Sequence, residues 1–201
     1  MRTITRAAGI PLAALLLASC GGGMHHGSAA KPTASSSFGP AAEGPHNDTD
    51  VAFATDMIPH HQQALEMADL ALDKATNAEV KALATAINGA QDPEIRTMSG
   101  WLTGWGKSVP ASGMHGGGHA MGSGDGMMTD DQMADLEKAS GSAFDKLWVE
   151  LMTEHHQGAV TMSTTELAQG QNAEAKALAQ QIIDAQTKEI ATMATLLKQL
   201  D

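Results

Sequence analysis

The sequence contains one cysteine, no tyrosine and few aromatic residues of any kind. Phe, Trp and Tyr together make up 3% of the 201 residues. A single cysteine excludes a disulfide within the chain, so any metal site must use histidine, methionine, carboxylate or amide ligands. Scarce aromatic residues disfavour strands, whereas the many alanines, leucines and methionines favour helices.

Basic residues are also in short supply. The chain has 12 Lys and Arg against 23 Asp and Glu, for a formal net charge of -11. A protein that binds nucleic acid through its phosphates needs clustered positive charge. We therefore expect no nucleic-acid partner, and no polybasic patch that would hold the chain on a membrane surface.

Long hydrophobic runs are lacking as well. The run IPLAALLLA (10–18) is shorter than the roughly 20 residues that span a bilayer, and it follows two arginines, as in a signal peptide. It ends in LASC (17–20), which resembles a bacterial lipobox with Cys20 as the lipidated residue. The alternative is an ordinary signal peptide with a chance cysteine. We expect residues 1–19 to be a lipoprotein signal peptide, and Cys20 to anchor the protein outside the cytoplasm, on the cell membrane or the outer membrane.

The rest of the chain divides into a tether and a helical region. Residues 20–47 are rich in Gly, Ser, Ala and Pro and predict a flexible tether. Helical periodicity then predicts four long helices and a short one, at about 48–74, 77–105, 129–140, 142–168 and 172–200. The short helix opens with the capping-box pattern T-x-x-Q at Thr129 to Gln132.

An internal repeat organises this helical region. Residues 95 positions apart match without a gap, so that MIPHHQQALEM (57–67) falls on MTEHHQGAVTM (152–162). Likewise NAEVKALATAI (77–87) falls on NAEAKALAQQI (172–182). Each half is a predicted helical hairpin that cannot bury its apolar face alone.

Two such hairpins predict an all-α four-helix bundle over residues 48–201. Repeat one spans 50–105 and repeat two spans 142–201. Residues 106–141, which include a glycine-rich stretch and the short helix, form the predicted crossover between the hairpins.

Histidine, methionine and glutamate fall on the apolar stripes of these helices. His60 shares the stripe of the first helix, His61 lies at its edge, and Glu94 stands on the stripe of the second. A buried carboxylate needs a partner, because its desolvation is costly. The candidate metal ligands are Met57, His60, His61, Met67, Gln91, Glu94 and Met98, together with the equivalent Met152, His155, His156, Met162, Gln186, Glu189 and Met193.

Two interpretations of these residues compete. In the first, Glu94 and Glu189 accept hydrogen bonds from His60 and His155, and the methionines only fill the core. In the second, the His, Met and Glu side chains converge on a metal ion. The concentration of methionine in the repeated motifs favours the second. Thioether and imidazole ligands suit copper, mainly Cu(I) with Cu(II) as the alternative, and the missing cysteines disfavour zinc.

The crossover adds a looser group of the same ligands. The stretch GMHGGGHAMGSGDGMM (113–128) has no periodicity with which to pack a core. It is either a linker of biased composition or a segment that captures metal. Its candidate secondary ligands are Met114, His115, His119, Met121, Met127 and Met128.

The doubled motif resembles a known family. The pattern F…MIPHHQQA…MA (53–68) and its counterpart FDKLWVELMTEHHQGAVTM (144–162) are similar to the domain of unknown function 305 family, over residues 50–201. The resemblance implies a ferritin-like helical bundle. Because the family includes CopM-like periplasmic copper-binding proteins, it also implies copper binding outside the cytoplasm, with the motif positions of both repeats as ligands.

The sequence therefore favours a membrane-anchored copper-binding lipoprotein that sequesters, buffers or transfers copper. The first alternative is a structural or interaction bundle without metal. A ferritin-like redox enzyme is a weaker alternative, because the bundle-facing stripes lack the Glu-x-x-His motifs of di-iron proteins. We expect a binding protein rather than an enzyme, and leave a copper-delivery partner and the oligomeric state open.

Overall fold

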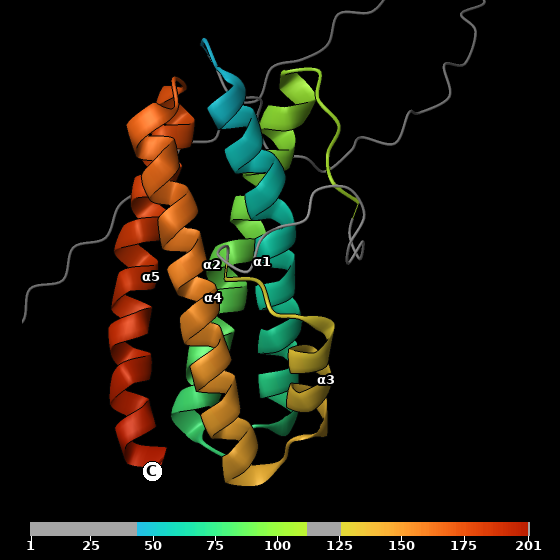
Figure 1. Ribbon diagram of the computed structural model, residues 1–201, viewed down its shortest axis with the longest axis vertical. Helices are drawn as coiled ribbons and strands as arrows, with labels where there is room; N and C mark the ends of the chain where they lie inside the picture. The colour runs from blue at the N-terminus through green and yellow to red at the C-terminus, as the bar shows by residue number, and fades with distance from the viewer. Residues whose placement is uncertain (1–43, 112–125, 201) are drawn as a thin grey trace, which may run out of the picture. The chain divides into compact units, whose positions relative to one another are not determined.

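The computed structural model describes residues 44–111 and 126–200, and in these ranges its regular structure is entirely helical. Figure 1 shows the helices in order along the chain. They are α1 (Asp48–Lys74), α2 (Ala78–Gly104), α3 (Asp130–Lys138), α4 (Gly141–Gln169) and α5 (Ala173–Leu200). The prediction of an all-α fold with four long helices and one short helix is confirmed.

Several predicted features lie outside the described residues. These are the signal peptide, the lipidation site Cys20, most of the tether, and the secondary ligands Met114, His115, His119 and Met121. Within the described residues, none of the helices is both long enough and apolar enough to cross a membrane.

Local sequence determines where the helices begin. The Asn47 side chain accepts hydrogen bonds from the backbone N–H groups of Thr49 and Asp50 at the start of α1. Asn77 caps α2 in the same way. The predicted capping box of α3 is present, with Thr129 and Gln132 each bonding the backbone of the other. Side-chain oxygens thus satisfy N–H groups that have no partner within the helix.

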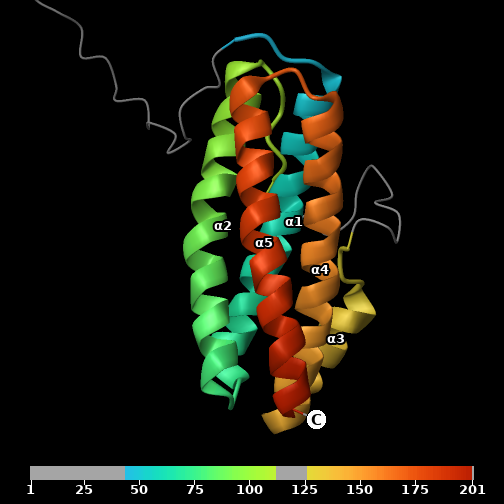
Figure 2. The same ribbon diagram turned by 90° about the vertical axis from the view of Figure 1, so that its left-hand side faces the viewer.

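The two hairpins pack side by side as a four-helix bundle. α1 pairs with α2 and α4 pairs with α5, and between the hairpins α1 packs closely along α4. In Figures 1 and 2, α1 and α5 run downward and α2 and α4 run upward, so that α1 and α4 are antiparallel. The single long crossover between α2 and α4, which contains α3, is the connection found in ferritin-like bundles.

Two equivalent aspartates lock the hairpins together. Asp50 of α1 accepts backbone hydrogen bonds from Gln171 (3.0 Å) and Asn172 (2.8 Å) in the turn between α4 and α5. Asp145, its counterpart in the second repeat, accepts backbone hydrogen bonds from Thr76 and Asn77, both at 3.0 Å, in the turn between α1 and α2. Each hairpin therefore binds the turn of the other, which fixes their relative height.

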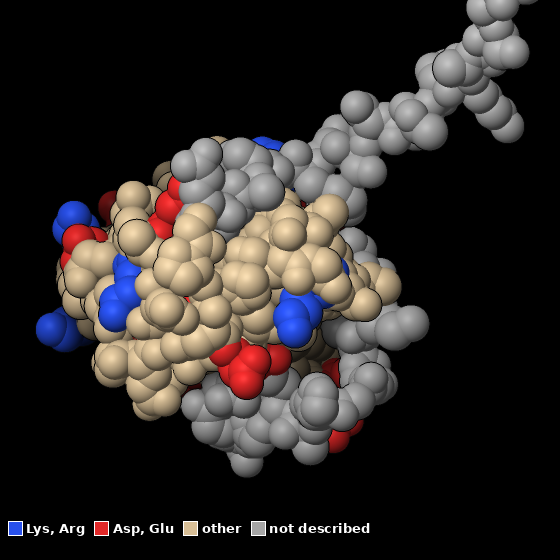
Figure 3. Space-filling model, turned by 90° about the horizontal axis from the view of Figure 1, so that it is seen from above, with Lys and Arg blue, Asp and Glu red and all other residues tan. Residues whose placement is uncertain are grey.

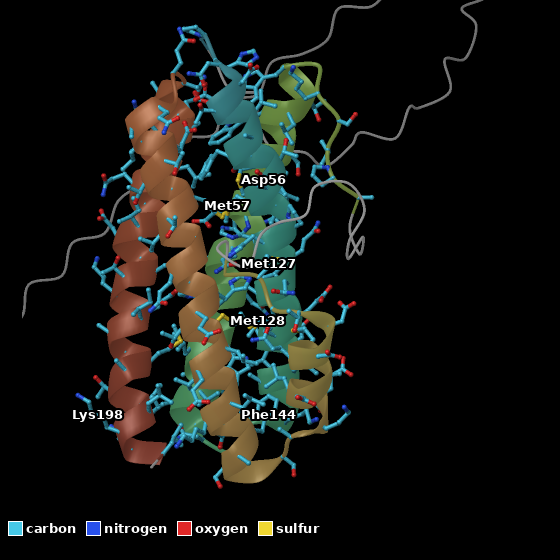
Figure 4. The ribbon with its side chains drawn as sticks, in the orientation of Figure 1. Asp56, Met57, Met127, Met128, Phe144 and Lys198 are labelled. Carbon is cyan, nitrogen blue, oxygen red and sulfur yellow. The ribbon has the colours of Figure 1, made fainter. Side chains whose placement is uncertain are left out.

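The crossover rejoins the bundle at the seam between α1 and α4. The buried Gln63 amide donates to the Met128 carbonyl oxygen at 2.9 Å and accepts from the Met128 N–H at 2.7 Å. Figure 4 shows Met127 and Met128 beside the middle of the bundle. The Met128 side chain is buried in the core, while Met127 is half-buried. These two residues of the predicted secondary metal group thus lie against the bundle.

Gly126 lets this segment of the crossover approach α4 closely. Its φ is +75°, a left-handed conformation that favours glycine. A Cβ atom there would lie 2.7 Å from the Glu154 carbonyl oxygen and 2.8 Å from the Gly158 Cα. Glycines on both sides of the contact therefore let the two backbones meet.

Candidate metal centre

Four fully buried histidines form a layer across the middle of the bundle. The rings of His60 from α1 and His155 from α4 face each other, with centroids 3.7 Å apart. His61 and His156 turn away from this pair, toward α2 and α5. Their Nε2 atoms each lie 2.7 Å from a carboxylate oxygen, of Glu94 and Glu189 respectively. All four histidine side chains have no solvent exposure.

The sequence-based pairing of histidine with glutamate was wrong in one respect. The metal-free interpretation paired the glutamates with His60 and His155, but the structure pairs them with His61 and His156. Successive residues on a helix point about 100° apart, so one imidazole faces the other hairpin and the next faces the partner helix. The glutamate side chains are also less buried than expected, with 20% and 21% exposure. The buried rings are therefore bonded to carboxylates that reach water.

The environment of this layer keeps the His155 imidazole neutral. Burial lowers the pKa of His155 well below the ordinary value of 6.5, and the neighbouring His60, His156 and His61 lower it further. A positive charge on this buried ring would be poorly solvated. Neutral imidazole is also the form that binds a metal ion, because a ring nitrogen must offer its lone pair.

Several ring nitrogens in the layer have no hydrogen-bond partner among the described residues. They are Nδ1 of His61, Nδ1 of His156, and both nitrogens of His155. A buried polar atom without a partner costs free energy and is uncommon in folded proteins. These atoms are therefore available to bind a ligand that enters the core.

A pair of methionines lies one helical turn from the histidine layer, toward the beginning of α1, which is the upper end of the bundle in Figure 1. The contact between His61 and Glu94 sets the register of α1 against α2. Met57 lies four residues before His61, and Met98 lies four residues after Glu94. Because α1 and α2 are antiparallel, both are displaced in the same direction along the bundle, and both are fully buried in one core cluster. Their thioethers therefore lie at the same height, about 6 Å along the axis from the contact.

The equivalent pair lies one turn below the layer. Met152 of α4 and Met193 of α5 are fully buried in the other core cluster. The contact between His156 and Glu189 sets their register in the same way. The Thr153 hydroxyl is 3.6 Å from the Met193 sulfur, close enough for a weak hydrogen bond.

Two further amides accompany these methionine pairs. Gln91 lies one turn from Glu94 on the side away from Met98, which brings it to the height of the lower pair. Gln186, the equivalent of Gln91 in the second repeat, lies at the height of the upper methionine pair. Both side chains are 3% exposed. The amide O and N of Gln91 and the amide O of Gln186 have no partner among the described residues.

The remaining two predicted ligands lie elsewhere. Met67 and Met162 follow His60 and His155 by seven residues, which is about 10 Å along a helix. Met67 is buried in the lower core, where its carbonyl oxygen accepts a hydrogen bond of 2.7 Å from the Trp148 indole. Met162 lines a pocket near the other end of the bundle. The structure thus brings twelve of the fourteen candidates into three adjacent layers.

The donor set determines which ions could fit these layers. Among residues 44–111 and 126–200, no three His, Cys, Asp or Glu side chains are grouped closely enough to hold a metal ion. Zinc and the hard divalent ions rely on such groups. The other candidate donors in these layers are imidazole nitrogens, thioether sulfurs and amide oxygens. Thioether ligands select a soft ion such as Cu(I).

Gln63 and Glu166 are among the buried polar residues that sequence reasoning missed. The Gln63 amide is hydrogen-bonded to the backbone of Met128 in the crossover. Glu166 is fully buried near the C-terminal end of α4. Both interrupt the repeat, since Gln63 matches Gly158 and Glu166 matches Ala71. A position where one repeat is small and the other is polar is the signal that could have found them.

Comparison with known proteins places the chain in a family. The model of the family called domain of unknown function (DUF305) matches residues 50–197. The chain matches none of the curated proteins.

Solved structures of the same family are similar to the chain over most of its length. A candidate secreted DUF305 protein from Streptomyces coelicolor is 33% identical, with a TM-score of 0.67, over 76% of this chain and 93% of that one. A DUF305 fragment from Deinococcus radiodurans is 29% identical, with a TM-score of 0.69, over 78% of this chain and 99% of that one.

The similar structures also include a protein named CopM. In its Cu(I)-bound form it is 32% identical, with a TM-score of 0.63, over 76% of this chain and 98% of that one. CopM structures with Cu(II) and with silver bound are similar to the chain as well.

Proposed function

The chain belongs to the DUF305 family, and we propose that it binds copper outside the cytoplasm, mainly as Cu(I), and sequesters, buffers or transfers it. The observation that carries the proposal is the buried histidine layer between two methionine pairs, in which ring nitrogens lack hydrogen-bond partners among the described residues. The copper and silver bound to the similar protein CopM support the same class of ion. Anchoring through Cys20 and an extracytoplasmic location are part of the proposal and rest on the N-terminal sequence.

Each side of the histidine layer offers a set of soft ligands. The upper set combines Met57 and Met98 with the histidine layer, and Gln186 stands beside it. The lower set repeats this arrangement with Met152 and Met193. Cu(I) would take thioether and imidazole ligands, and the neutral His155 ring would need to lose no proton to bind it. Two equivalent sets predict up to two ions per chain.

We propose binding rather than catalysis. A di-iron enzyme of ferritin-like fold needs four carboxylates, with a Glu-x-x-His motif on each of two helices. In the described residues each hairpin brings one glutamate, Glu94 or Glu189, to the histidine layer. Capture and release of an ion, without turnover of a substrate, is the chemistry that these ligands suit.

A Cu(I) competition titration tests the proposal. The chain would be titrated without oxygen against a chromophoric Cu(I) chelator. Replacing Met57 and Met98 with leucine keeps the core volume but removes both thioethers of the upper set. We expect this variant to lose roughly one Cu(I) ion per chain, or to bind it at least tenfold more weakly. The matched control is Met67→Leu, which changes an equally buried methionine of the same helix outside the layers.

The alternative function is a structural bundle without metal. The short contacts of His61 with Glu94 and of His156 with Glu189 favour it, because they stabilise the fold without any ion. In that case the wild-type chain would not compete for Cu(I), and a His60→Ala/His155→Ala variant would be less stable with no change in metal affinity. Equal Cu(I) binding by wild type and both methionine variants would show that the upper set holds no ion. A chain lacking residues 112–125 would then test the crossover.

A further inference from the structure

Two histidines of the buried layer are bonded to carboxylates that face water. His61 and His156 are fully buried, while the glutamates that they contact are 20% and 21% exposed. The upper end of the bundle, seen in Figure 3, carries scattered acidic and basic side chains on a mostly uncharged surface. Glu94 and Glu189 instead stand at mid-height on α2 and α5 and reach water from the flanks. Each of them therefore links a buried ring to the solvent.

The carboxylate determines which nitrogen of each ring carries a proton. The Nε2 atoms of His61 and His156 lie 2.7 Å from the carboxylate oxygens of Glu94 and Glu189. An ionised carboxylate accepts hydrogen bonds but donates none, so the proton in each contact belongs to Nε2. In a neutral ring the other nitrogen, Nδ1, then carries a lone pair. The glutamates thus leave Nδ1 as the atom that can bind a metal ion.

The Nδ1 atoms have no other use among the described residues. In both rings Nδ1 is buried and lacks a hydrogen-bond partner within residues 44–111 and 126–200. A buried polar atom of this kind is uncommon, because it has lost its bond to water and gained none in the protein. The same atom is left over in both repeats. A ligand that bonds Nδ1 would remove this cost twice in one chain.

The methionines of the first hairpin lie next to its ring. Met57 precedes His61 by four residues on the same face of α1. Side chains of a helix lean toward its N-terminus, so the His61 ring leans toward Met57, and Met98 on α2 leans back toward Glu94. Both methionines are fully buried in one core cluster. The imidazole and the two thioethers are therefore directed toward the same region of the first hairpin.

The second hairpin repeats this arrangement 95 residues later. Met152 and Met193 are fully buried in the other core cluster and stand to His156 and Glu189 as their equivalents do in the first. In the described part of the chain, no three His, Cys, Asp or Glu side chains are grouped to hold a metal ion. The glutamates are therefore better placed to bond the histidines than to bind an ion themselves.

We propose that each hairpin binds its own ion through Nδ1 of one histidine and two thioethers, and that a glutamate positions the histidine. The ligands are Met57, His61 and Met98 in the first hairpin and Met152, His156 and Met193 in the second. Glu94 and Glu189, predicted from the sequence as ligands, are positioning residues that fix the orientation and the tautomer of the ring from the solvent side. The proposal rests on the copper-binding function proposed above and assigns its ligand atoms.

The tautomer is measured on the full chain without metal. With ¹⁵N-labelled histidine, two-bond ¹H–¹⁵N correlation spectra show which ring nitrogen carries the proton, and His61→Gln and His156→Gln variants assign the signals. We expect a proton on Nε2 and none on Nδ1 in both rings. Glu94→Leu should release His61 from this tautomer, whereas Glu94→Gln should retain it, because the amide oxygen still accepts a hydrogen bond. Glu79→Leu, at an exposed position of the same helix, should leave the spectrum of His61 unchanged.

Silver(I), a soft and diamagnetic ion, then probes the bound state. On saturation, the Nδ1 signals of His61 and His156 should shift while both Nε2 atoms keep their protons. In the Cu(I) competition titration, Glu94→Leu should weaken binding of one of two ions roughly tenfold or more. Glu94→Gln should restore the affinity to within about threefold of wild type, because it preserves the hydrogen bond to the ring.

Three results would overturn the proposal. The first is a proton on Nδ1 rather than Nε2 of His61 and His156 in the metal-free chain. The second is a silver ion that displaces the Nε2 protons. The third is wild-type Cu(I) affinity in both Glu94→Leu and Glu189→Leu. Each can occur in a chain that still binds Cu(I), and then only this assignment of ligands fails. A wild-type chain that binds neither ion would overturn the copper proposal and this assignment together.

Discussion

The protonation of Glu166 should make the stability of this bundle fall as the pH rises. Burial and the neighbouring Asp50 raise the pKa of Glu166 from 4.5 to about 8. The folded state therefore holds a proton on Glu166 up to about pH 8, whereas the unfolded chain releases it near pH 4.5. Between these values the unfolded state binds fewer protons, so the free energy of unfolding decreases with rising pH. The contribution is fully present below pH 4.5 and is lost above pH 8.

The size of this effect follows from the pKa change. Each pKa unit is worth about 1.4 kcal/mol, so a rise from 4.5 to about 8 is worth at most about 5 kcal/mol. Ionisation of a buried carboxyl lets the surrounding structure relax and draws in water, which reduces this cost. We therefore expect a loss of roughly 2–3 kcal/mol between pH 5 and pH 9. His155 opposes this trend at the acidic end, because its lowered pKa reduces stability as the pH falls below 6.5.

The effect of Glu166 is separated from that of His155 by comparing two chains. The free energy of unfolding in urea would be measured by circular dichroism from pH 5 to pH 9 for wild type and for Glu166→Gln. The difference, wild type minus variant, should fall by roughly 2–3 kcal/mol across this range. Glu150→Gln, exposed on the same helix, should follow the wild type at every pH. A difference that stays constant from pH 5 to pH 9 would refute the reasoning.

Three further predictions concern the contacts that assemble the bundle. Asp145→Ala leaves the backbone N–H groups of Thr76 and Asn77 without their charged acceptor, and should cost roughly 3 kcal/mol in urea unfolding. Gly126→Ala places a Cβ in a left-handed conformation against the α4 backbone; it should cost about 2 kcal/mol and speed amide exchange of the neighbouring crossover residues. Trp148→Phe removes the indole bond to a carbonyl oxygen of α1, and should cost about 1–2 kcal/mol, measured by the same urea unfolding.

Much of the fold follows from local signals in the sequence. Helical periodicity predicted the four long helices, and asparagine and threonine caps mark where α1, α2 and α3 begin. Such signals act within a few residues, so a single chain displays them directly. The repeat showed that the four long helices form two equivalent hairpins. Because each hairpin has an apolar face to bury, it also predicted that the two hairpins pack against each other.

The candidate site was predictable in its residue types but not in its partners. The motif identified His60, His61 and Glu94 as buried or bordering the core. Which histidine meets the glutamate depends on the rotation of α1 between α2 and α4, and the structure assigned it to His61. Likewise, the sequence grouped Met67 with the site, but a helix rises about 10 Å over seven residues and carries this side chain out of the layer.

The sequence by itself determined that this chain is a duplicated helical hairpin with histidine, methionine and glutamate on its inner faces. The tertiary structure decided which of these side chains meet. It put His60 against His155, buried one pair of methionines in each of the two core clusters, and brought Glu166 beside Asp50. Periodicity along a helix depends on neighbours in the chain, so sequence reveals it. Contact between helices depends on their register and rotation, which here are fixed by Asp50 and Asp145 reaching across to the opposite hairpin.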